Sequence, residues 1–407
     1  MRARDKRGPR LVVIPTDPIA VLERAGLDWL ERYYNPAGMF GEVFALSPLE
    51  LGEREAHGMT IVGVGERDFK HALRQIRPDV VRAYGGFWSA DLACRGRIRG
   101  VPVVVSVHDT NPTLLHESVR HADIVICMSG AVQKLVWELG TDPGRTRVLP
   151  NRVDGTVFRP IREATVLDSV ARRFPPGKHI LHVGRRSHQK NLDTLIGALA
   201  LLPADYSCIF VGLGDRSAYL ELAETLGVAE RCFWVDSVKN SELPIWYSWC
   251  DCMCVPSRWE GFGIVFIEAA ACGAAIVTSA IAPMNEYLRH GVSACLVKEA
   301  ETPKALAAAL HRVCENADYR RTLSAGALAA ARPFDRKAVD AAEVAIYREV
   351  MDLKPAPLSR RAARSLWRAK ERTAALVKAM QGRRVVASLR ARLRGGVGPD
   401  PRPAQFR

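Results

Sequence analysis

The residues best suited to chemistry lie between Val255 and Leu288, where two glutamates frame a short glycine loop. Glu260 precedes the loop Gly261–Gly263, and Glu268 lies eight residues after Glu260 in an apolar, alanine-rich segment. Glycine lets a ligand approach the backbone, and a helix that begins in the loop would direct free N–H groups at that ligand. A buried carboxylate needs hydrogen-bond donors, and the two hydroxyls of a ribose would supply them. The alternative is that Glu268 lies on the solvent face of its helix.

A second loop, Val183–Asn191, combines a glycine with cations. Gly184 follows an apolar segment, and Arg185 and Lys190 bring positive charge to the same loop. Such a loop can bind an anion and stabilise its negative charge. No Asp-x-Asp motif follows a predicted strand, so we expect no divalent metal. The alternative is a solvated basic turn that binds nothing.

His108 ends the apolar segment Val101–Val107, and Asp109 follows it. Ligands of parallel α/β sheets bind at the carboxyl ends of the strands, so a histidine at this position is a candidate for catalysis. Asp109 would orient the imidazole ring or cap a turn. The alternative is a histidine whose hydrogen bonds are satisfied locally.

Segments of strand length alternate with helical segments along most of the chain, which predicts an α/β fold with doubly wound parallel sheets. A chain of 407 residues is too long for one core, so we expect two domains. A final amphipathic helix is predicted over Pro333–Val350. The predicted strands are Leu11–Ile14, Gly58–Gly63, Val80–Ala83, Val101–Val107, Ile124–Met128, His179–Val183, Ser207–Val211, Cys232–Val235, Asp251–Val255 and Ala275–Thr278.

The net charge of +14 is concentrated at the C-terminus. Residues 351–407 hold 15 Lys and Arg against 3 Asp and Glu, a net charge of +12, so the rest of the chain carries +2. Arginines on one face of a helix and weakly apolar residues on the other predict docking on an anionic membrane surface through residues 358–394. The alternative is a disordered basic extension. No regular interleaving of aromatic and basic residues supports a specific nucleic-acid partner.

The ten cysteines form no paired C-x-x-C units and no Cys/His cluster with zinc spacing. Cys250, Cys252 and Cys254 alternate along a predicted strand, which would place them on one face as reduced, buried thiols. No apolar stretch is long enough to cross a membrane. The apolar run near the N-terminus stops at Pro15, too early for a signal peptide. We therefore expect a cytoplasmic protein.

The stretch from Glu260 to Glu268, with its flanking residues, resembles the Glu-(seven residues)-Glu motif of retaining, nucleotide-sugar-dependent glycosyltransferases with the GT-B fold, glycosyltransferase family 4. Two departures stand out, because Arg152 and Asn191 occupy positions where that family usually has glycine. The loop Pro15–Pro18 also lacks the Gly-Gly pair that many members carry. Further similar stretches, in the family's order, are Arg77–Ala83, Gly100–Asp109, Ala122–Ser129, Val148–Asp154 and Gly184–Asn191.

The resemblance implies the GT-B fold, with two Rossmann-like, doubly wound parallel-sheet domains that face a central cleft. We expect an acceptor-side domain over residues 1–160, onto which residues 336–352 cross back. A donor-binding domain would span residues 161–335, and the basic tail would span residues 353–407.

The resemblance also implies roles for individual residues. Arg185 and Lys190 would contact the donor diphosphate, and Glu268 would bind the ribose. Glu260 would lie beside the donor sugar and the phosphates, and these residues would form the catalytic set together with His108. The full donor-binding set is Gly184, Arg185, Lys190, Glu260, Gly261, Phe262, Gly263 and Glu268.

The activity implied is transfer of a sugar, with retention of configuration, from a UDP- or GDP-linked donor to an envelope glycan or lipid-linked acceptor. No metal or other cofactor is expected, and the enzyme would lie in the cytoplasm, peripherally on the inner face of the membrane. One alternative is a GT-B epimerase or hydrolase of nucleotide sugars. Another is an inactive GT-B protein that binds a membrane or nucleic acid through its tail.

Overall fold

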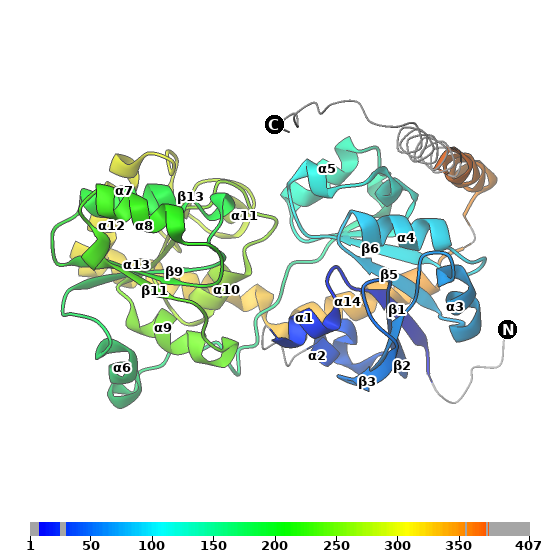
Figure 1. Ribbon diagram of the computed structural model, residues 1–407, viewed down its shortest axis with the longest axis horizontal. Coiled ribbons are helices and arrows are strands. Elements are labelled where there is room, and N and C mark those ends of the chain that lie inside the picture. The colour runs from blue at the N-terminus through cyan, green and yellow to red at the C-terminus, as the bar shows by residue number, and fades with distance from the viewer. Residues whose placement is uncertain (1–7, 25–29, 355, 372, 374–407) are drawn as a thin grey trace, which may run out of the picture. The chain divides into compact units, whose positions relative to one another are not determined.

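The computed structural model describes residues 8–24, 30–354, 356–371 and 373, and it divides into two units, residues 1–353 and residues 354–407. The first unit contains two sheets, each with helices on both of its faces (Figure 1). In the second unit, residues 358–371 are helical. No helix among the described residues is long and apolar enough to span a membrane.

The first sheet has eight strands among the described residues, in the order β3-β4-β2-β1-β5-β6-β7-β8. All neighbours pair in parallel except β3 and β4, which form an antiparallel edge. Its strands are β1 (Arg10–Ile14), β2 (Glu42–Ser47), β3 (Glu53–Ala56), β4 (Met59–Gly63), β5 (Val80–Tyr84), β6 (Val103–Val107), β7 (Ile124–Cys127) and β8 (Thr146–Val148). Its helices include α1 (Ile19–Arg24), α2 (Leu30–Tyr34), α3 (Phe69–Ile76), α4 (Trp88–Gly96) and α5 (Gly130–Glu138).

The second sheet has six parallel strands among the described residues, in the order β11-β10-β9-β12-β13-β14. Its strands are β9 (Lys178–Val183), β10 (Tyr206–Val211), β11 (Cys232–Val235), β12 (Cys252–Val255), β13 (Ile276–Ser279) and β14 (Cys295–Val297). The helices that follow the first domain are α6 (Ala164–Ala171), α7 (Leu192–Ala200), α8 (Ser217–Thr225), α9 (Leu243–Trp249), α10 (Ile264–Ala271), α11 (Met284–Tyr287), α12 (Pro303–Glu315), α13 (Ala317–Ala331) and α14 (Arg336–Met351).

The predicted fold class, two doubly wound α/β domains, is confirmed by these two sheets. The interior strand β2 and the edge strands β3, β8 and β14 were not among the predicted strands. β3 has the sequence EREA, without an apolar alternation, and β8 and β14 are only three residues long, so their sequences carry little strand signal. Cys250 precedes β12 and caps the end of α9, so it does not share a strand face with Cys252 and Cys254 as predicted. None of the ten cysteines, all of which lie in the described part of the chain, forms a disulfide.

The central strands of the second sheet are buried on both faces, and alternate residues enter different cores. Ile180 of β9 belongs to the core under α7 and α12, whereas its neighbour Leu181 belongs to the core under α9 and α10. The same alternation separates Cys252 and Cys254 from Met253 and Val255 in β12. The sheet is thereby held rigidly from both sides, and the loops at the carboxyl ends of β9 and β12 have a fixed base.

The chain crosses between the two sheets twice, and the two crossings lie side by side. The Val153 amide donates to the Phe334 carbonyl at 2.9 Å, and the Arg336 amide donates to the Val153 carbonyl at 3.0 Å. After the second crossing α14, orange in Figure 1, packs on the first domain. There the buried Arg82 of β5 forms an ion pair with Glu343 and donates to the Tyr347 hydroxyl at 2.8 Å.

Arg152 lies in the first crossing, at a position where glycine is usual in the family that the sequence resembles. Its φ is not positive, so the turn needs no left-handed residue. Its guanidinium forms ion pairs with Asp340 and Glu343 of α14. The arginine therefore ties the crossing to the helix that returns to the first domain.

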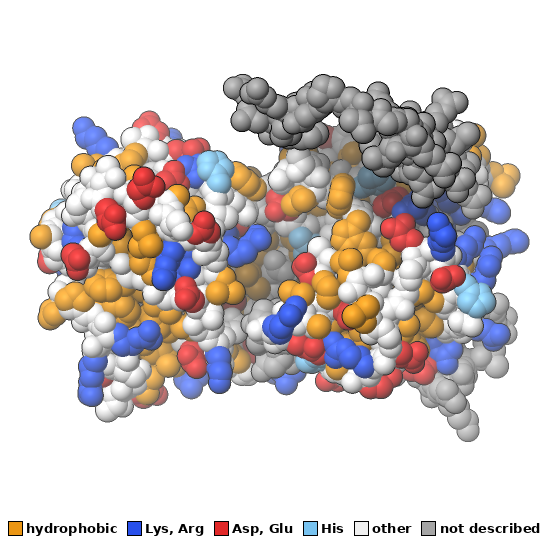
Figure 2. Space-filling view, viewed as in Figure 1, with side chains coloured by type: hydrophobic (Ala, Val, Ile, Leu, Met, Phe, Trp, Pro, Cys, Tyr) orange, Lys and Arg blue, Asp and Glu red, His pale blue; other side chains and the backbone are white. Residues whose placement is uncertain are grey.

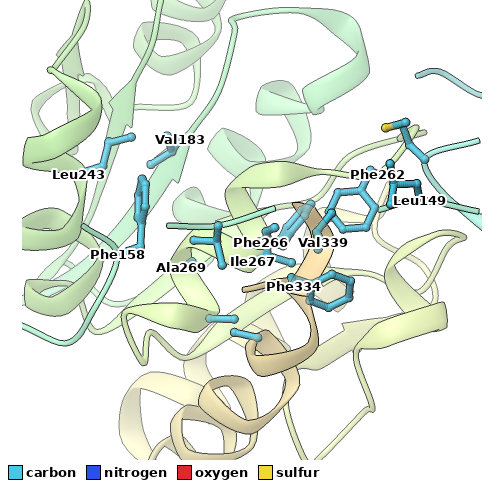
Figure 3. Packing of buried hydrophobic residues seen from close by; sticks show 14 of the residues in the cluster. Leu149, Phe158, Val183, Leu243, Phe262, Phe266, Ile267, Ala269, Phe334 and Val339 are labelled. Atoms are coloured by element: carbon cyan, nitrogen blue, oxygen red, sulfur yellow. The ribbon is translucent and has the colours of Figure 1, made fainter. Parts of the chain in front are cut away.

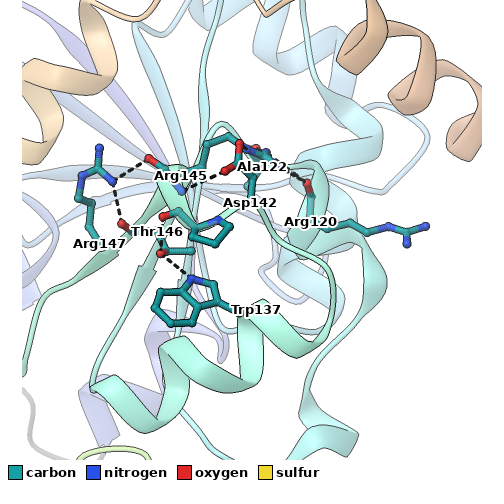
Figure 4. Close-up of polar contacts among 9 residues, drawn as sticks. Arg120, Ala122, Trp137, Asp142, Arg145, Thr146 and Arg147 are labelled. Carbon is teal, nitrogen blue, oxygen red and sulfur yellow. Dashed lines mark hydrogen bonds and ion pairs between the residues drawn. The ribbon is translucent and has the colours of Figure 1, made fainter.

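Polar contacts fix the corner between α5 and β8 (Figure 4). The Trp137 indole N–H donates to Thr146 Oγ1 at 3.0 Å, and the Arg145 guanidinium donates to the Ala122 carbonyl at 2.6 Å. These contacts hold α5 against the sheet edge, and its first residues enter the site described next. On the face shown in Figure 2, acidic and basic side chains are interspersed, in keeping with the small net charge outside the tail.

Candidate active site

The loop between β12 and α10 lies against the carboxyl end of β6. Gly261 touches the His108 backbone there, and a Cβ atom at Gly261 would stand 1.7 Å from the His108 carbonyl oxygen. Gly263 then begins α10 with φ +80°, a conformation that favours glycine. No side chain fits at Gly261, so this close approach accounts for the first glycine of the predicted loop.

Hydrogen bonds reinforce this junction between the two sheets. Thr110 Oγ1 donates to the Glu260 carbonyl at 3.0 Å, and Ser129 Oγ donates to the Gly261 carbonyl at 2.7 Å. The structure therefore brings the predicted residues His108 and Glu260 into neighbouring loops.

The Glu260 carboxylate is buried and paired. Its Oε1 atom forms an ion pair with Lys190 and accepts a hydrogen bond from Ser257 Oγ at 2.7 Å. Lys190 is buried as well, and its side chain lies against Gly184. The predicted diphosphate loop and the predicted glycine loop therefore share one ion pair, which the spacing of the residues did not reveal.

The two adjacent arginines of the diphosphate loop differ in their surroundings. Arg185 is exposed and has no hydrogen-bond or ion-pair partner in the part of the chain that the structure describes. Arg186 is buried, and its guanidinium donates to Asp236 Oδ1 at 3.0 Å, to the Gly214 carbonyl at 3.1 Å and to the Val235 carbonyl at 3.2 Å. Arg186 therefore holds the loop in place, whereas Arg185 remains available to a ligand.

Asn191 ends this loop in the left-handed conformation, with φ +57° and ψ +43°. Asparagine tolerates this region better than most residues because its short polar side chain can bond locally. Here Asn191 Nδ2 donates to the Pro256 carbonyl at 2.9 Å and to the Ala300 carbonyl at 3.1 Å. The cost of placing asparagine instead of glycine at this left-handed position is therefore offset by its hydrogen bonds, and the bond to Pro256 links the two loops of the site.

Glu268 lies on the buried side of α10, with only 6% of its surface exposed. Burial raises the pKa of its carboxyl group to about 8, although the hydrogen bond from the Tyr247 hydroxyl at 3.3 Å opposes this shift. The alternative of a solvent-facing glutamate is therefore wrong. A buried acid with one long hydrogen bond can accept further donors from a ligand.

His108 is half-buried, and its Nε2 atom is buried without a hydrogen-bond partner among the described residues. Burial, assisted by the Arg82 guanidinium, lowers the pKa of this imidazole to about 4. The ring is therefore neutral at pH 7 and leaves one buried nitrogen available. The alternative of a fully satisfied histidine does not hold for Nε2.

Phe262 anchors the glycine loop in the core (Figure 3). Its ring stacks on Tyr287 with the centroids 5.2 Å apart and meets the edge of Phe334 at 5.5 Å. The Tyr287 hydroxyl also donates to the Phe262 carbonyl at 2.8 Å. Phe262 therefore holds the loop against the core, and the backbone of its neighbours Gly261 and Gly263 remains for contact with a ligand.

Sequence reasoning missed several residues of this site. Tyr247 and Ser257 touch the two motif glutamates, but isolated polar residues give no pattern to find them by. Glu286 was also missed, although its carboxylate accepts hydrogen bonds from the Gly130 and Ala131 amides at 2.8 and 2.7 Å at the start of α5. A negative charge is stabilised at this end of a helix, so Glu286 adds a further link between the domains.

Comparison with known families gives two matches along the chain. Residues 62–156 match the family described as Glycosyltransferase Family 4, and residues 169–329 match Glycosyl transferases group 1. A D-inositol 3-phosphate glycosyltransferase of Xylanimonas cellulosilytica is 30% identical over 272 residues, which cover 64% of this chain and 62% of that protein. The protein of the same name from Mycolicibacterium gilvum is 33% identical over 200 residues, covering 47% and 44%. The chain thus spans less than two thirds of the length of these relatives.

Solved structures with the same fold are more distant in sequence. Anabaena Alr3699/HepE in complex with UDP and glucose superposes with a TM-score of 0.69 at 17% identity, covering 84% of this chain and all of that one. Sucrose-phosphate synthase of Thermosynechococcus elongatus superposes with a TM-score of 0.68 at 18% identity, covering 84% of this chain and 99% of that one. At these identities the likeness concerns the fold.

Proposed function

We propose that this chain is a GT-B glycosyltransferase of family 4 and that it transfers a sugar from a nucleotide-sugar donor to a hydroxyl group of a glycan or lipid-linked acceptor, which the two family matches support. The observation that carries the proposal is the junction of the two domains, where the loop of the neutral His108 meets the loop of Glu260, which is ion-paired with Lys190. The unpaired Arg185 belongs to the same loop as Lys190, and the buried Glu268 belongs to the helix that follows Glu260. UDP or GDP is the proposed nucleotide, and a structural neighbour crystallised with UDP and glucose supports the first.

The diphosphate of the donor would be bound by the loop after β9. Arg185 is free to contact it, and the Lys190 ammonium is already oriented by Glu260 and Gly184. Cations fixed before the reaction stabilise the growing charge of the leaving group without a reorganisation cost. This arrangement supports catalysis without a metal ion.

The ribose would be bound by Glu268. Its carboxyl group has few partners in the free protein, and a ribose diol supplies two O–H donors. Both donors favour the ionised form, so nucleotide binding should lower the pKa of this group and release a proton around pH 7.

Retention of configuration by a front-side route is also part of the proposal. The Glu260 carboxylate is engaged by Lys190 and Ser257, which makes it a poor nucleophile for a double displacement. In the front-side route the bond between the anomeric carbon and the diphosphate breaks as the acceptor oxygen attacks. The acceptor proton passes to the departing phosphate, and His108 Nε2 would bind a sugar hydroxyl nearby.

A thermal-shift series with UDP, GDP, ADP and their sugars tests the donor site, since a ligand that binds only the folded state raises the Tm. We expect one nucleotide and its sugar to raise the Tm, and the matching 2′,3′-dideoxynucleotide to raise it much less. Incubation of that nucleotide sugar with an envelope extract should then give a glycosylated product. Release of free sugar alone, at the same rate with and without extract, would favour the hydrolase alternative.

A further inference from the structure

A hollow of about 320 Å³ opens beside the proposed reaction centre. It is lined by Thr110, Asn111 and Pro112 of the loop after β6, and by Trp259 of the loop after β12. Thr110 lies two positions after His108, and Trp259 immediately precedes Glu260. Three of the four belong to the domain opposite the proposed donor site, which is where an acceptor must lie to attack the donor sugar.

Trp259 is held in place at this hollow. Gln189 Nε2 of the diphosphate loop donates to the Trp259 carbonyl at 3.0 Å, and the Arg258 amide donates to the Gln189 carbonyl at 2.8 Å. Its ring lies 6.0 Å from the His188 ring, centroid to centroid. These bonds fix the backbone at Trp259, and its half-buried indole has a flat apolar face on which a ligand can pack.

The polar groups of the hollow are amide and hydroxyl groups. Asn111 Oδ1 accepts from Thr113, whereas Asn111 Nδ2 has no hydrogen-bond partner among the residues that the structure describes. None of the four lining residues carries a charge. The neighbouring Asp109 is acidic, and its carboxylate accepts a hydrogen bond from the backbone N–H of Asn111 at 2.8 Å.

A phosphorylated acceptor does not suit such a surface. Phosphate groups are bound by arginine, lysine or several N–H donors, and burying one without such partners is costly. A pyranose ring suits it well, because its C–H face can pack on the indole while its hydroxyls bond to Asn111. Pro112 at the hollow is exposed, and so is Leu114 two residues later in the same loop. The exposed Phe87 follows Gly86, whose carbonyl accepts from the His116 amide of that loop at 2.8 Å, and we call Pro112, Leu114 and Phe87 the apolar lip.

We propose that this hollow is the acceptor subsite and that it selects an uncharged glycoside with an apolar aglycone, with Trp259 as the residue that determines this specificity. The proposal rests on the proposed function, and it separates this chain from relatives named D-inositol 3-phosphate glycosyltransferases. The sugar ring stacks on Trp259, and the aglycone leaves over the apolar lip.

The test is saturation-transfer NMR on the full-length protein with UDP or GDP present. The probes are n-octyl glucoside, galactoside and mannoside below their micellar concentrations, with D-myo-inositol 3-phosphate as the charged competitor. We expect saturation of ring C–H protons for at least one glycoside and none for the inositol phosphate. Trp259→Ala should weaken glycoside binding about tenfold, and Trp259→Phe should keep most of it.

Trp137→Ala is the matched control, because Trp137 is also a partly exposed tryptophan of the same unit but lies outside the hollow. It should leave glycoside binding unchanged. Binding of inositol phosphate in preference to every glycoside, or equal glycoside binding by Trp259→Ala and wild type, would overturn the inference. Failure of all nucleotides to raise the Tm would instead count against the proposed function itself.

Discussion

Arg185 is exposed and its neighbour Arg186 is buried, so substituting each in turn distinguishes an effect on ligand binding from an effect on stability. Arg185→Ala removes an unpaired cation, and we expect turnover to fall by the equivalent of about 2–4 kcal/mol in the barrier with no loss of Tm. Arg186→Ala removes three hydrogen bonds from a buried guanidinium, and we expect a lower Tm instead. Transfer rates and thermal unfolding of both variants check this, and normal turnover in Arg185→Ala would remove it from the site.

Lys190 serves both the proposed leaving group and the buried Glu260. Lys190→Met leaves the Glu260 carboxylate without its cation, and the free energy of unfolding should fall by about 3–5 kcal/mol. Adding Glu260→Gln should restore much of that stability without restoring transfer, because the charge on the diphosphate stays uncompensated. Denaturant unfolding and transfer assays of the single and double variants measure the two effects. Recovery of transfer in the double variant would contradict a role for Lys190 at the donor.

Glu268 makes the stability of the free protein depend on pH. Its carboxyl pKa rises from 4.5 to about 8 on folding, so between these values the folded protein binds more protons than the unfolded chain. Stability contributed by this group is therefore present below pH 4.5 and is lost as the pH rises towards 8. In Glu268→Gln this decline should disappear. Unfolding curves of both proteins between pH 5 and 9 test it, and parallel curves would argue against a buried, protonated Glu268.

At the scale of elements, the site depends on one close approach between the loop after β12 and the end of β6. Gly261→Ala places a methyl group into the His108 carbonyl, so the loops must separate. We expect transfer to fall by about two orders of magnitude, since a displacement of about 1 Å can cost this much. Nucleotide binding should persist, because the residues proposed to bind the diphosphate and the ribose, Arg185, Lys190 and Glu268, do not take part in this contact with His108. Gly65→Ala is the control, as a Cβ atom there meets nothing within 4 Å.

The sequence predicted the elements that carry strong periodicity and the residues that form compact motifs. The strands around the site and the loops at Gly184 and Gly261 were found in this way. Edge strands such as β3 were missed because charged, short segments have no apolar alternation. Partners such as Tyr247 were missed because the contact with Glu268 arises only when α9 packs beside α10. The Lys190–Glu260 pair joins residues seventy positions apart, and no local pattern encodes it.

At the scale of the whole molecule, the basic tail is proposed to hold the enzyme on an anionic membrane surface. Its helical residues 358–371 include the exposed Leu358 and Leu366, and residues 351–407 carry +12 of the net charge. The predicted helix beyond residue 373 lies outside the described residues. Each Lys or Arg near an anionic surface adds up to about 1 kcal/mol, and salt should weaken the attraction.

Truncation after Asp352 tests the tail. The shortened protein should lose binding to anionic liposomes in sedimentation assays and keep the nucleotide-induced rise in Tm. Full-length protein should not bind neutral liposomes, and its helical signal in circular dichroism should increase when anionic liposomes are added. Equal sedimentation of the two proteins with anionic liposomes would discard the membrane role, and binding without added helix would favour a disordered extension.

The paired crossings also bear on how the two domains can move. Because two chain segments, hydrogen-bonded to each other at Val153, connect the domains, a bending motion of one domain against the other is easier than a twisting motion. A protease cut in either crossing alone should therefore leave the halves associated, because the other segment and α14 still join them. Any swing that separates the two domains must also break the hydrogen bonds of Glu286 and Ser129 across their junction, so these bonds oppose opening.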